Sequence, residues 1–322
     1  MGGVADRQKT MFENAVDIVD NVSLRRTTVL AVIFLCEVKS MSTDPKKQHY
    51  VWEYYLKAWA MKNKIWCLRK GKIFNTSTEN IAHERYFYET SEFSSGEIKL
   101  VESILNLGEG LTRADNLNTF RTYIEVARAN ERSRRFGVEW YHGIVENKIV
   151  PIMEILKAGN SSVLNNPKDK IEFCIFLGEQ YMRTKRIRES RFSLPENHKI
   201  PDEYRACDFK KIFEALTFVY ANNIGAQIHS ALEIRLVENT SNTNLITSDQ
   251  PIYNLSAKPG EEAHELSIYY SIGPRRAIFA RKSPNLAKIE TGDEVIELNE
   301  FMANNSHELL FAQSKEDLQG FS

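Results

Sequence analysis

The sequence predicts an α+β fold, a single domain with a helical middle and a mostly antiparallel sheet. Apolar residues recur every three or four positions between about residues 96 and 189, which is typical of helices. Short apolar runs bounded by turn residues lie on both sides of that segment, near residues 64–75 and after residue 232. Their short connections favour antiparallel pairing, because parallel strands need long crossovers. An N-terminal hairpin and the C-terminal strands are therefore expected to build the sheet.

The composition is that of an ordinary globular protein. The chain has 322 residues, with 42% hydrophobic and 26% charged content, which is enough to bury a core. Lys plus Arg total 42 against 43 for Asp plus Glu, so no overall positive field favours nucleic acid or an anionic membrane. The four cysteines form no Cys-x-x-Cys pair, which disfavours a zinc ribbon or a disulfide scaffold. We expect a cytoplasmic protein with no stable membrane association.

Residues 1–40 are expected to be an N-terminal extension, and 41–322 the domain. The apolar run 27–36 is too short to span a bilayer, and no small residues follow it as a signal-cleavage site would require. Met41 is a candidate native start, which would make residues 1–40 a mis-called addition. If they are translated and folded, residues 29–35 would pack on the domain.

The segment after residue 47 predicts an aromatic core helix followed by a hairpin. Helical spacing places Val51, Tyr55 and Trp59 on one face, with His49 in the first turn. Two short runs, 64–69 and 72–75, flank Lys70-Gly71 and predict the hairpin.

The helical middle contains two basic features. A helix over 139–156 is expected to kink or break at Pro151. Before it, residues 131–135 form a basic cluster that either touches phosphate or caps a solvated helix end. In the helix expected over 169–189, Glu179, Arg183 and Arg186 share one side. Two arginines there would clamp an anion, or Glu179 and Arg183 would simply form a surface pair.

The C-terminal part predicts a helix over 209–228 and then strands. Residues 232–237 alternate, and we expect the turn after them to return the chain as a hairpin through 245–249. Further strands are expected over 266–272 and 277–280. A final helix begins near Thr291, whose spacing to Glu294 fits a capping box.

The run 245–253 is the stretch most suggestive of a site. Pro251 cannot continue a sheet ladder, so the strand is expected to end with Ser248 and Asp249 at its exposed end. The alternative is a plain turn, because both side chains readily bond nearby backbone amides.

Several separated motifs resemble those of the family known as domain of unknown function 4238. They are Gln48-His49-Tyr50-Val51, Ile81-Ala82-x-Glu84 with Phe87-Tyr88, Gln180 with Arg183-Thr184, Ile246-Thr247-Ser248-Asp249-x-Pro251, Ile272-x-Pro274 and Leu298-Asn299. The resemblance covers about residues 48–311 and implies an intracellular α+β domain without assigning an activity. Trp52 and Gln250 depart from the residues common in the family at these positions.

The recurring polar residues suggest one shared site. We expect His49, Glu84 and Asp249 to be catalytic, with Glu84 and Asp249 holding Mg²⁺ or Mn²⁺. The expected substrate-binding residues are Gln180, Arg183, Arg186, Ser248 and Asn299. This set would suit a metal-assisted phosphodiester hydrolase acting on nucleic acid or a nucleotide, such as a nuclease-like toxin or an antiviral effector in phage defence.

Two other classes remain open. One is a noncatalytic module that binds a nucleotide or anion through Arg183 and Arg186. The other is a structural or interaction protein whose polar residues cap helices and turns. The sequence contains no Walker loop, Gly-x-Gly-x-x-Gly, His-Glu-x-x-His or Gly-x-Ser-x-Gly motif.

Overall fold

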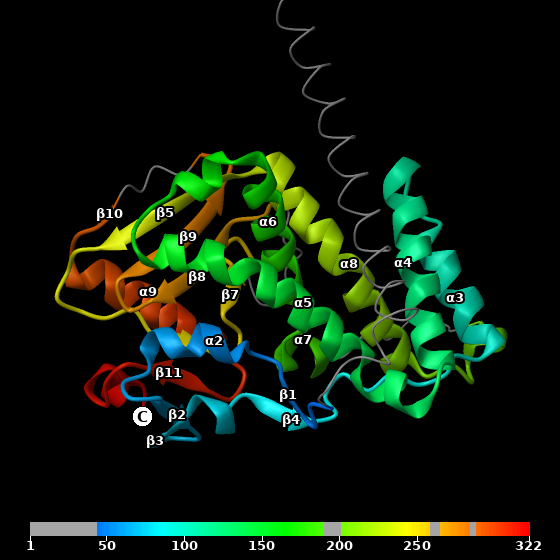
Figure 1. Ribbon diagram of the computed structural model, residues 1–322, viewed down its shortest axis with the longest axis horizontal. Helices are drawn as coiled ribbons and strands as arrows, with labels where there is room; N and C mark the ends of the chain where they lie inside the picture. The colour runs from blue at the N-terminus through cyan, green and yellow to red at the C-terminus, as the bar shows by residue number, and fades with distance from the viewer. Residues whose placement is uncertain (1–43, 190–200, 258–264, 284–287) are drawn as a thin grey trace, which may run out of the picture.

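The computed structural model describes residues 44–189, 201–257, 265–283 and 288–322 (Figure 1). The expectations for residues 1–40 lie outside these ranges. The α+β class is confirmed, with a helical middle and largely antiparallel strands. A single domain over 41–322 stays a prediction.

The helical middle of the chain folds as expected, with shifted boundaries. Its α-helices are α3 (Ser95–Leu105), α4 (Gly110–Arg128), α5 (Glu131–Lys157), α6 (Pro167–Met182), α7 (Lys185–Glu189) and α8 (Phe209–Ala231). The short helices are α2 (Glu53–Leu56), η2 (Lys57–Trp59), η3 (Thr78–Asn80), η4 (Ser162–Asn165), η5 (Asp202–Tyr204) and η6 (Glu316–Phe321), and α9 spans Gly292–Asn305. None of the helices in the described ranges combines the length and apolar content needed to cross a bilayer.

Side-chain caps explain where most of the long helices begin. Ser94 and Glu97 form a capping box at α3, and Thr291 and Glu294 form the expected one at α9. Asn130, Asn166 and Asp208 accept backbone N–H groups at the starts of α5, α6 and α8. Of the two outcomes expected at Pro151, a kink or a break, the break is excluded, because α5 continues through this residue.

Within the described ranges the strands form three sheets in place of the single sheet that was expected. The strands are β1 (Lys47–His49), β2 (Lys64–Arg69), β3 (Lys72–Ser77), β4 (His83–Arg85), β5 (Glu233–Asn239), β6 (Thr247–Ser248), β7 (Ile252–Asn254), β8 (Ile268–Gly273), β9 (Arg276–Arg281), β10 (Lys288–Ile289) and β11 (Leu310–Ala312). Their orders are β1-β4, β10-β5-β9-β8-β7 and β3-β2-β11-β6, and all neighbours are antiparallel except β10 and β5. The expected hairpin is confirmed as β2–β3, with Lys70 and Gly71 both at positive φ in its turn.

Two local expectations are wrong. His49 does not start a helix, because it ends strand β1 opposite His83 of β4, although Val51, Tyr55 and Trp59 are fully buried as expected. The segment after β5 does not return as its hairpin partner. β5 pairs with β9, whereas β6 pairs with β11 in another sheet.

The described residues form three buried apolar clusters. Helices α3, α4, α5 and α8 pack together at one end of the molecule, and the two larger sheets with α9 lie at the other, with the β1–β4 pair below the middle (Figure 1). Between them, α5 and α6 pack against residues 50–59, β7 and β8. The close pair α6–α8 crosses at Gly178 and Gly225, where side chains would not fit. This pair separates the two cavities described below.

Candidate functional site

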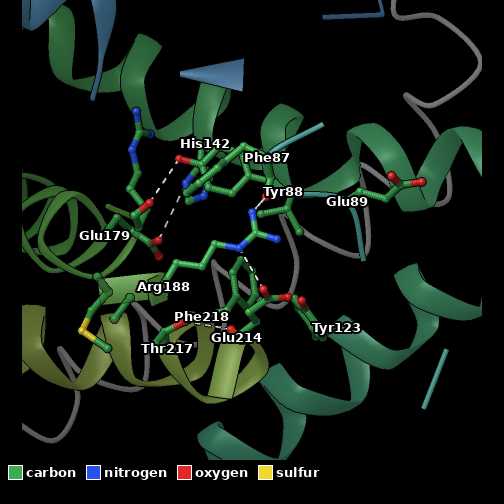
Figure 2. Close-up of a pocket in the computed structure, with 14 residues that line it drawn as sticks. Phe87, Tyr88, Glu89, Tyr123, His142, Glu179, Arg188, Glu214, Thr217 and Phe218 are labelled. Carbon is green, nitrogen blue, oxygen red and sulfur yellow. Dashed lines mark hydrogen bonds and ion pairs between the residues drawn. The ribbon is translucent and has the colours of Figure 1, made fainter. Parts of the chain in front are cut away.

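A cavity of about 60 Å³ with a mostly apolar lining lies between α5, α6, α8 and the residues after β4 (Figure 2). Its wall includes the rings of Phe87, Tyr88, Tyr123 and Phe218. Ionisable side chains line the same space from three helices and from α7. They are His142 of α5, Glu179 and Arg183 at the end of α6, Arg188 of α7 and Glu214 of α8.

A histidine and a carboxylate face each other on one side of the cavity. His142 Nδ1 lies 3.9 Å from Glu179 Oε2, and the Tyr141 hydroxyl donates to Glu179 Oε1 at 2.8 Å. Both His142 and Glu179 are buried. The Tyr88 ring packs on the imidazole with 4.7 Å between centroids. The 3.9 Å separation is within ion-pair range for a protonated imidazole but is longer than a hydrogen bond.

Two arginines reach the cavity from different elements. Arg188 Nε donates to Glu214 Oε1 at 2.8 Å, and a second guanidinium nitrogen donates to the Phe87 carbonyl (Figure 2). Arg183 donates to Glu146 Oε1 at 2.6 Å and to the His49 carbonyl at 3.3 Å. Burial acts against the Arg183 charge, but the neighbouring Glu146 raises its pKa above the usual value.

A second carboxyl group of α5 is held neutral beside this network. Burial, followed by the charge of Glu146, raises the pKa of Glu139 to about 8. Glu139, His142 and Glu146 follow one another at three and four residues along α5, so they share one face of the helix. The Glu139 carboxyl group therefore keeps its proton at neutral pH, close to Arg183.

Glu139→Gln should remove a pH-dependent loss of stability. The folded pKa of about 8 lies above the reference value of 4.5. Between these values the unfolded chain is ionised while the folded protein keeps the proton, so the free energy of unfolding falls as pH rises. Glutamine mimics the neutral acid, so wild type and variant should match near pH 5. At pH 8 the variant should be more stable by about 4 kcal/mol, given about 1.4 kcal/mol for each of the 3.5 pKa units between 4.5 and about 8.

Urea unfolding between pH 5 and 9 measures this difference. Glu125→Gln, which changes an exposed carboxylate of α4, is the matched control and should not alter the pH profile. Parallel profiles for wild type and Glu139→Gln would contradict a neutral Glu139.

The structure brings His49 and Arg183 together. Their contact, however, does not place the His49 imidazole as a general base next to an arginine that binds an anion. The contact uses the His49 backbone carbonyl. Burial and the neighbouring His83 lower the pKa of the His49 imidazole to about 4, so it stays neutral near pH 7. Arg186 does not share a clamp with Arg183, because α6 ends before Arg183 and Arg186 belongs to α7. Its guanidinium bonds the Asn305 carbonyl.

Glu84 and Asp249 lie in one polar network, and both carboxylates are already engaged. Lys185 Nζ lies 2.9 Å from Glu84 Oε1 and 3.5 Å from Glu308 Oε1. Asp249 accepts the backbone N–H groups of His307, Glu308 and Leu309 at 2.8–3.1 Å. Burial raises the pKa of Asp249, while these bonds act in the opposite direction.

The expected metal site has no support in this geometry. Across the described ranges, no group of three or more His, Cys, Asp or Glu side chains is placed to hold a metal ion. The expected exposure of Ser248 and Asp249 is also wrong, because both are fully buried. Strand β6 is covered by β11 on one side, and the segment 305–309 folds over its end.

Ser248 and Asn299 have structural partners. Ser248 Oγ donates to the Gln250 carbonyl at 2.9 Å and accepts the Gln250 N–H at 3.1 Å, which is the plain-turn alternative. Asn299 accepts the Ile246 N–H at 3.0 Å and donates to the Asn244 carbonyl at 2.8 Å. It joins α9 to the chain entering β6.

Gln180 is fully buried, and neither of its amide atoms has a hydrogen-bond partner among the described residues. Gln180→Met should therefore stabilise the fold by about 1 kcal/mol, because it removes unsatisfied polar atoms at nearly constant volume. The matched control is Gln250→Met. The Gln250 amide bonds Thr184 and the Ile252 carbonyl, so this change should destabilise by about 1–3 kcal/mol. Urea unfolding at pH 7 compares them, and a destabilised Gln180→Met would show that the amide is satisfied in solution.

Sequence reasoning missed His142, Arg188 and Glu214. The available signal was the row Glu139, His142 and Glu146, which recur at helical spacing in α5. Glu179 was noticed, but as part of a surface pair. The basic cluster 131–135 is confirmed as an ion-paired helix start, with Arg132 bonded to Asp44 and Arg135 to Glu89.

These features define an α+β protein with a buried acid–base and arginine cluster at a small cavity. The chain belongs to the family described as Protein of unknown function (DUF4238), whose model matches residues 47–316. No curated protein and no solved structure matches it.

Proposed function

We propose that this protein is a phosphodiester hydrolase and that the cavity between α5, α6 and α8 is its active site. One observation carries the proposal: a histidine–carboxylate pair and two arginines line the same cavity. Histidine is suited to proton transfer near neutral pH, and arginine donates two parallel hydrogen bonds to phosphate oxygens. The surrounding rings offer stacking surfaces for a base or another flat group.

The residues suggest a hydrolysis in which His142 acts first as the general base and then as the general acid. His142 takes a proton from water as the water oxygen bonds to phosphorus. The bond from phosphorus to the leaving oxygen then breaks, and His142 returns the proton to that oxygen, giving an alcohol and a phosphate monoester. Glu179 holds the imidazole in position and stabilises its charged form. Arg188 and Arg183 bind the non-bridging oxygens, exchanging Glu214 and Glu146 for phosphate.

This route differs from the metal-assisted one expected from the sequence. Lys185 engages Glu84 and three backbone amides engage Asp249, so we place the chemistry at His142 instead. A nuclease-like toxin or antiviral effector remains the biological role that we propose for such an activity.

The test is cleavage by the purified full chain of RNA, single- and double-stranded DNA, and linear and cyclic dinucleotides, in EDTA and with Mg²⁺ or Mn²⁺. We expect cleavage of at least one substrate in EDTA and a loss of about 10²-fold or more in His142→Asn, the range for a lost general base. His307→Asn is the control, because His307 pairs with Glu189 outside the cavity. Thermal unfolding checks that both variants fold.

Two results would contradict the proposal: equal rates in wild type and His142→Asn, or no cleavage of any substrate. Cleavage that requires a divalent ion, is lost in Glu84→Ala and survives in His142→Asn would move the site to Glu84.

A noncatalytic nucleotide-binding module is the second candidate. Glu214 and Glu146 already compensate the charges of Arg188 and Arg183, an arrangement that would hold a ligand without needing to turn it over. The same substrates measured by calorimetry separate the two candidates. Binding that Arg188→Ala weakens, without any turnover, would favour the module.

A further inference from the structure

A second and larger cavity, of about 290 Å³, lies between α4, α6 and α8. It approaches the lower end of the range of about 300–1,000 Å³ typical of small-molecule sites. It lies beside the close crossing of α6 and α8, and Gly225 and Ala226 are among its lining residues. The cavity shares no lining residue with the proposed active site.

The polar lining of this cavity consists mostly of amides and hydroxyls. Asn116, Asn222, Asn223 and Gln227 contribute side-chain amides, and Thr119 is one of the hydroxyl-bearing residues. Asn222 Oδ1 is shielded from solvent and has no hydrogen-bond partner among the described residues. A shielded acceptor of this kind needs an N–H or O–H donor.

The charge of the lining argues against an anionic ligand. Neither lysine nor arginine lines the cavity, and Asp115 is its carboxylate. Burial, together with the charge of Lys170, lowers the pKa of His229, so the imidazole is neutral at pH 7. Nothing in the lining would neutralise a phosphate.

The apolar part of the lining comes from α6. Ile171, Cys174 and Ile175 form this wall, and the amides come from α4 and α8. A ligand that fits both the apolar α6 wall and the amides of α4 and α8 has an apolar face and a polar edge, as a heteroaromatic ring does. Asparagine and glutamine amides pair well with the donor and acceptor edges of nucleobases.

We propose that the cavity between α4, α6 and α8 is a second binding site, for an uncharged nucleoside that carries no phosphate. The base rests on the α6 wall and pairs with the side-chain amides that line the cavity, Asn222 among them. The hydroxyls of the ribose bond the threonine and amide side chains. This site is independent of the hydrolase proposal, because its evidence uses other residues and other chemistry.

Calorimetry and thermal shift with adenosine, guanosine, cytidine and uridine test the site, with each 5′-monophosphate and glucose as comparison ligands. We expect one-to-one binding of at least one nucleoside and at least tenfold weaker binding of its monophosphate. Asn222→Leu should weaken binding at least tenfold. Gln227→Leu at an exposed position and Ala226→Leu, which fills the space, provide further variants if Asn222→Leu does not fold. His142→Asn should bind as wild type does.

The proposal is overturned if no nucleoside binds the folded protein, or if glucose or a monophosphate binds as tightly as the nucleoside. It is also overturned if His142→Asn abolishes binding while the three cavity variants retain it, since the ligand then occupies the other cavity. Binding is measured without turnover, so an absence of hydrolase activity leaves this result interpretable.

Discussion

Gly178→Ala is expected to destabilise the protein by about 3 kcal/mol, at the upper end of the range for overpacking a well-packed core. A Cβ at Gly178 would lie 2.1 Å from the Ala221 carbonyl oxygen and 2.8 Å from the Gly225 nitrogen. Both atoms belong to the backbone of α8, so no side-chain rotation relieves the contact. The two helices would have to separate.

The chain provides a matched control for this change. Gly143 also lies inside a long helix, α5, but a Cβ there meets no atom within 4 Å. Gly143→Ala should therefore be neutral or stabilising by about 0.4–1 kcal/mol, because alanine lowers the entropy of the unfolded chain. Urea unfolding of both variants measures the difference. Similar stabilities for the two variants would mean that α6 and α8 are further apart in solution than in the structure.

Local signals in the sequence predicted the elements well because their causes are local. Thr291 and Glu294 form the expected capping box, and Lys70-Gly71 forms the expected hairpin turn. Each depends on residues a few positions apart, which the sequence shows directly. The same holds for the buried face of Val51, Tyr55 and Trp59.

The pairing of strands could not be predicted in the same way. β6 pairs with β11, more than fifty residues later, whereas the nearer strand β5 was expected. The turn after β5 looks like a hairpin turn, but Asn239 bonds the Thr243 and Pro274 carbonyls and fixes it against another segment. Such hydrogen bonds form only in the folded protein. The spacing of apolar residues in the sequence therefore does not predict them.

Only part of the candidate site could be predicted from the sequence, and the reason is electrostatic. A charged residue on a helix usually faces water, so Glu179 and Arg183 suggested a surface pair. In the structure Glu179 is buried, and the Arg183 side chain is 5% exposed beside Glu146. Packing places Glu146 of α5 beside Arg183, and Glu179 accepts a hydrogen bond from the Tyr141 hydroxyl. Periodicity alone does not show that such partners exist.

Asp249 illustrates how a polar residue that looks catalytic in sequence can have a structural role. Its Oδ1 accepts the His307 N–H, and its Oδ2 accepts those of Glu308 and Leu309. These bonds hold the segment between α9 and β11 across the end of β6. The sequence led us to expect a catalytic, metal-holding carboxylate at this position. The geometry instead predicts that replacing it lowers the stability of the protein.

Asp249→Asn should destabilise the protein by about 2–3 kcal/mol and Asp249→Ala by about 3–5 kcal/mol, from the cost of leaving buried donors unsatisfied and of breaking a buried charged network. Asparagine offers one acceptor oxygen, and its NH₂ group must then face at least one backbone N–H that it cannot bond. Asp293→Asn is the control, because Asp293 is exposed in the first turn of α9 and should contribute only about 0.3–1 kcal/mol through the helix dipole. Chemical denaturation at pH 7 ranks the three variants. If Asp249→Asn were as stable as wild type, the carboxylate would not be holding residues 307–309, and a role in binding or catalysis would again be the better explanation of its burial.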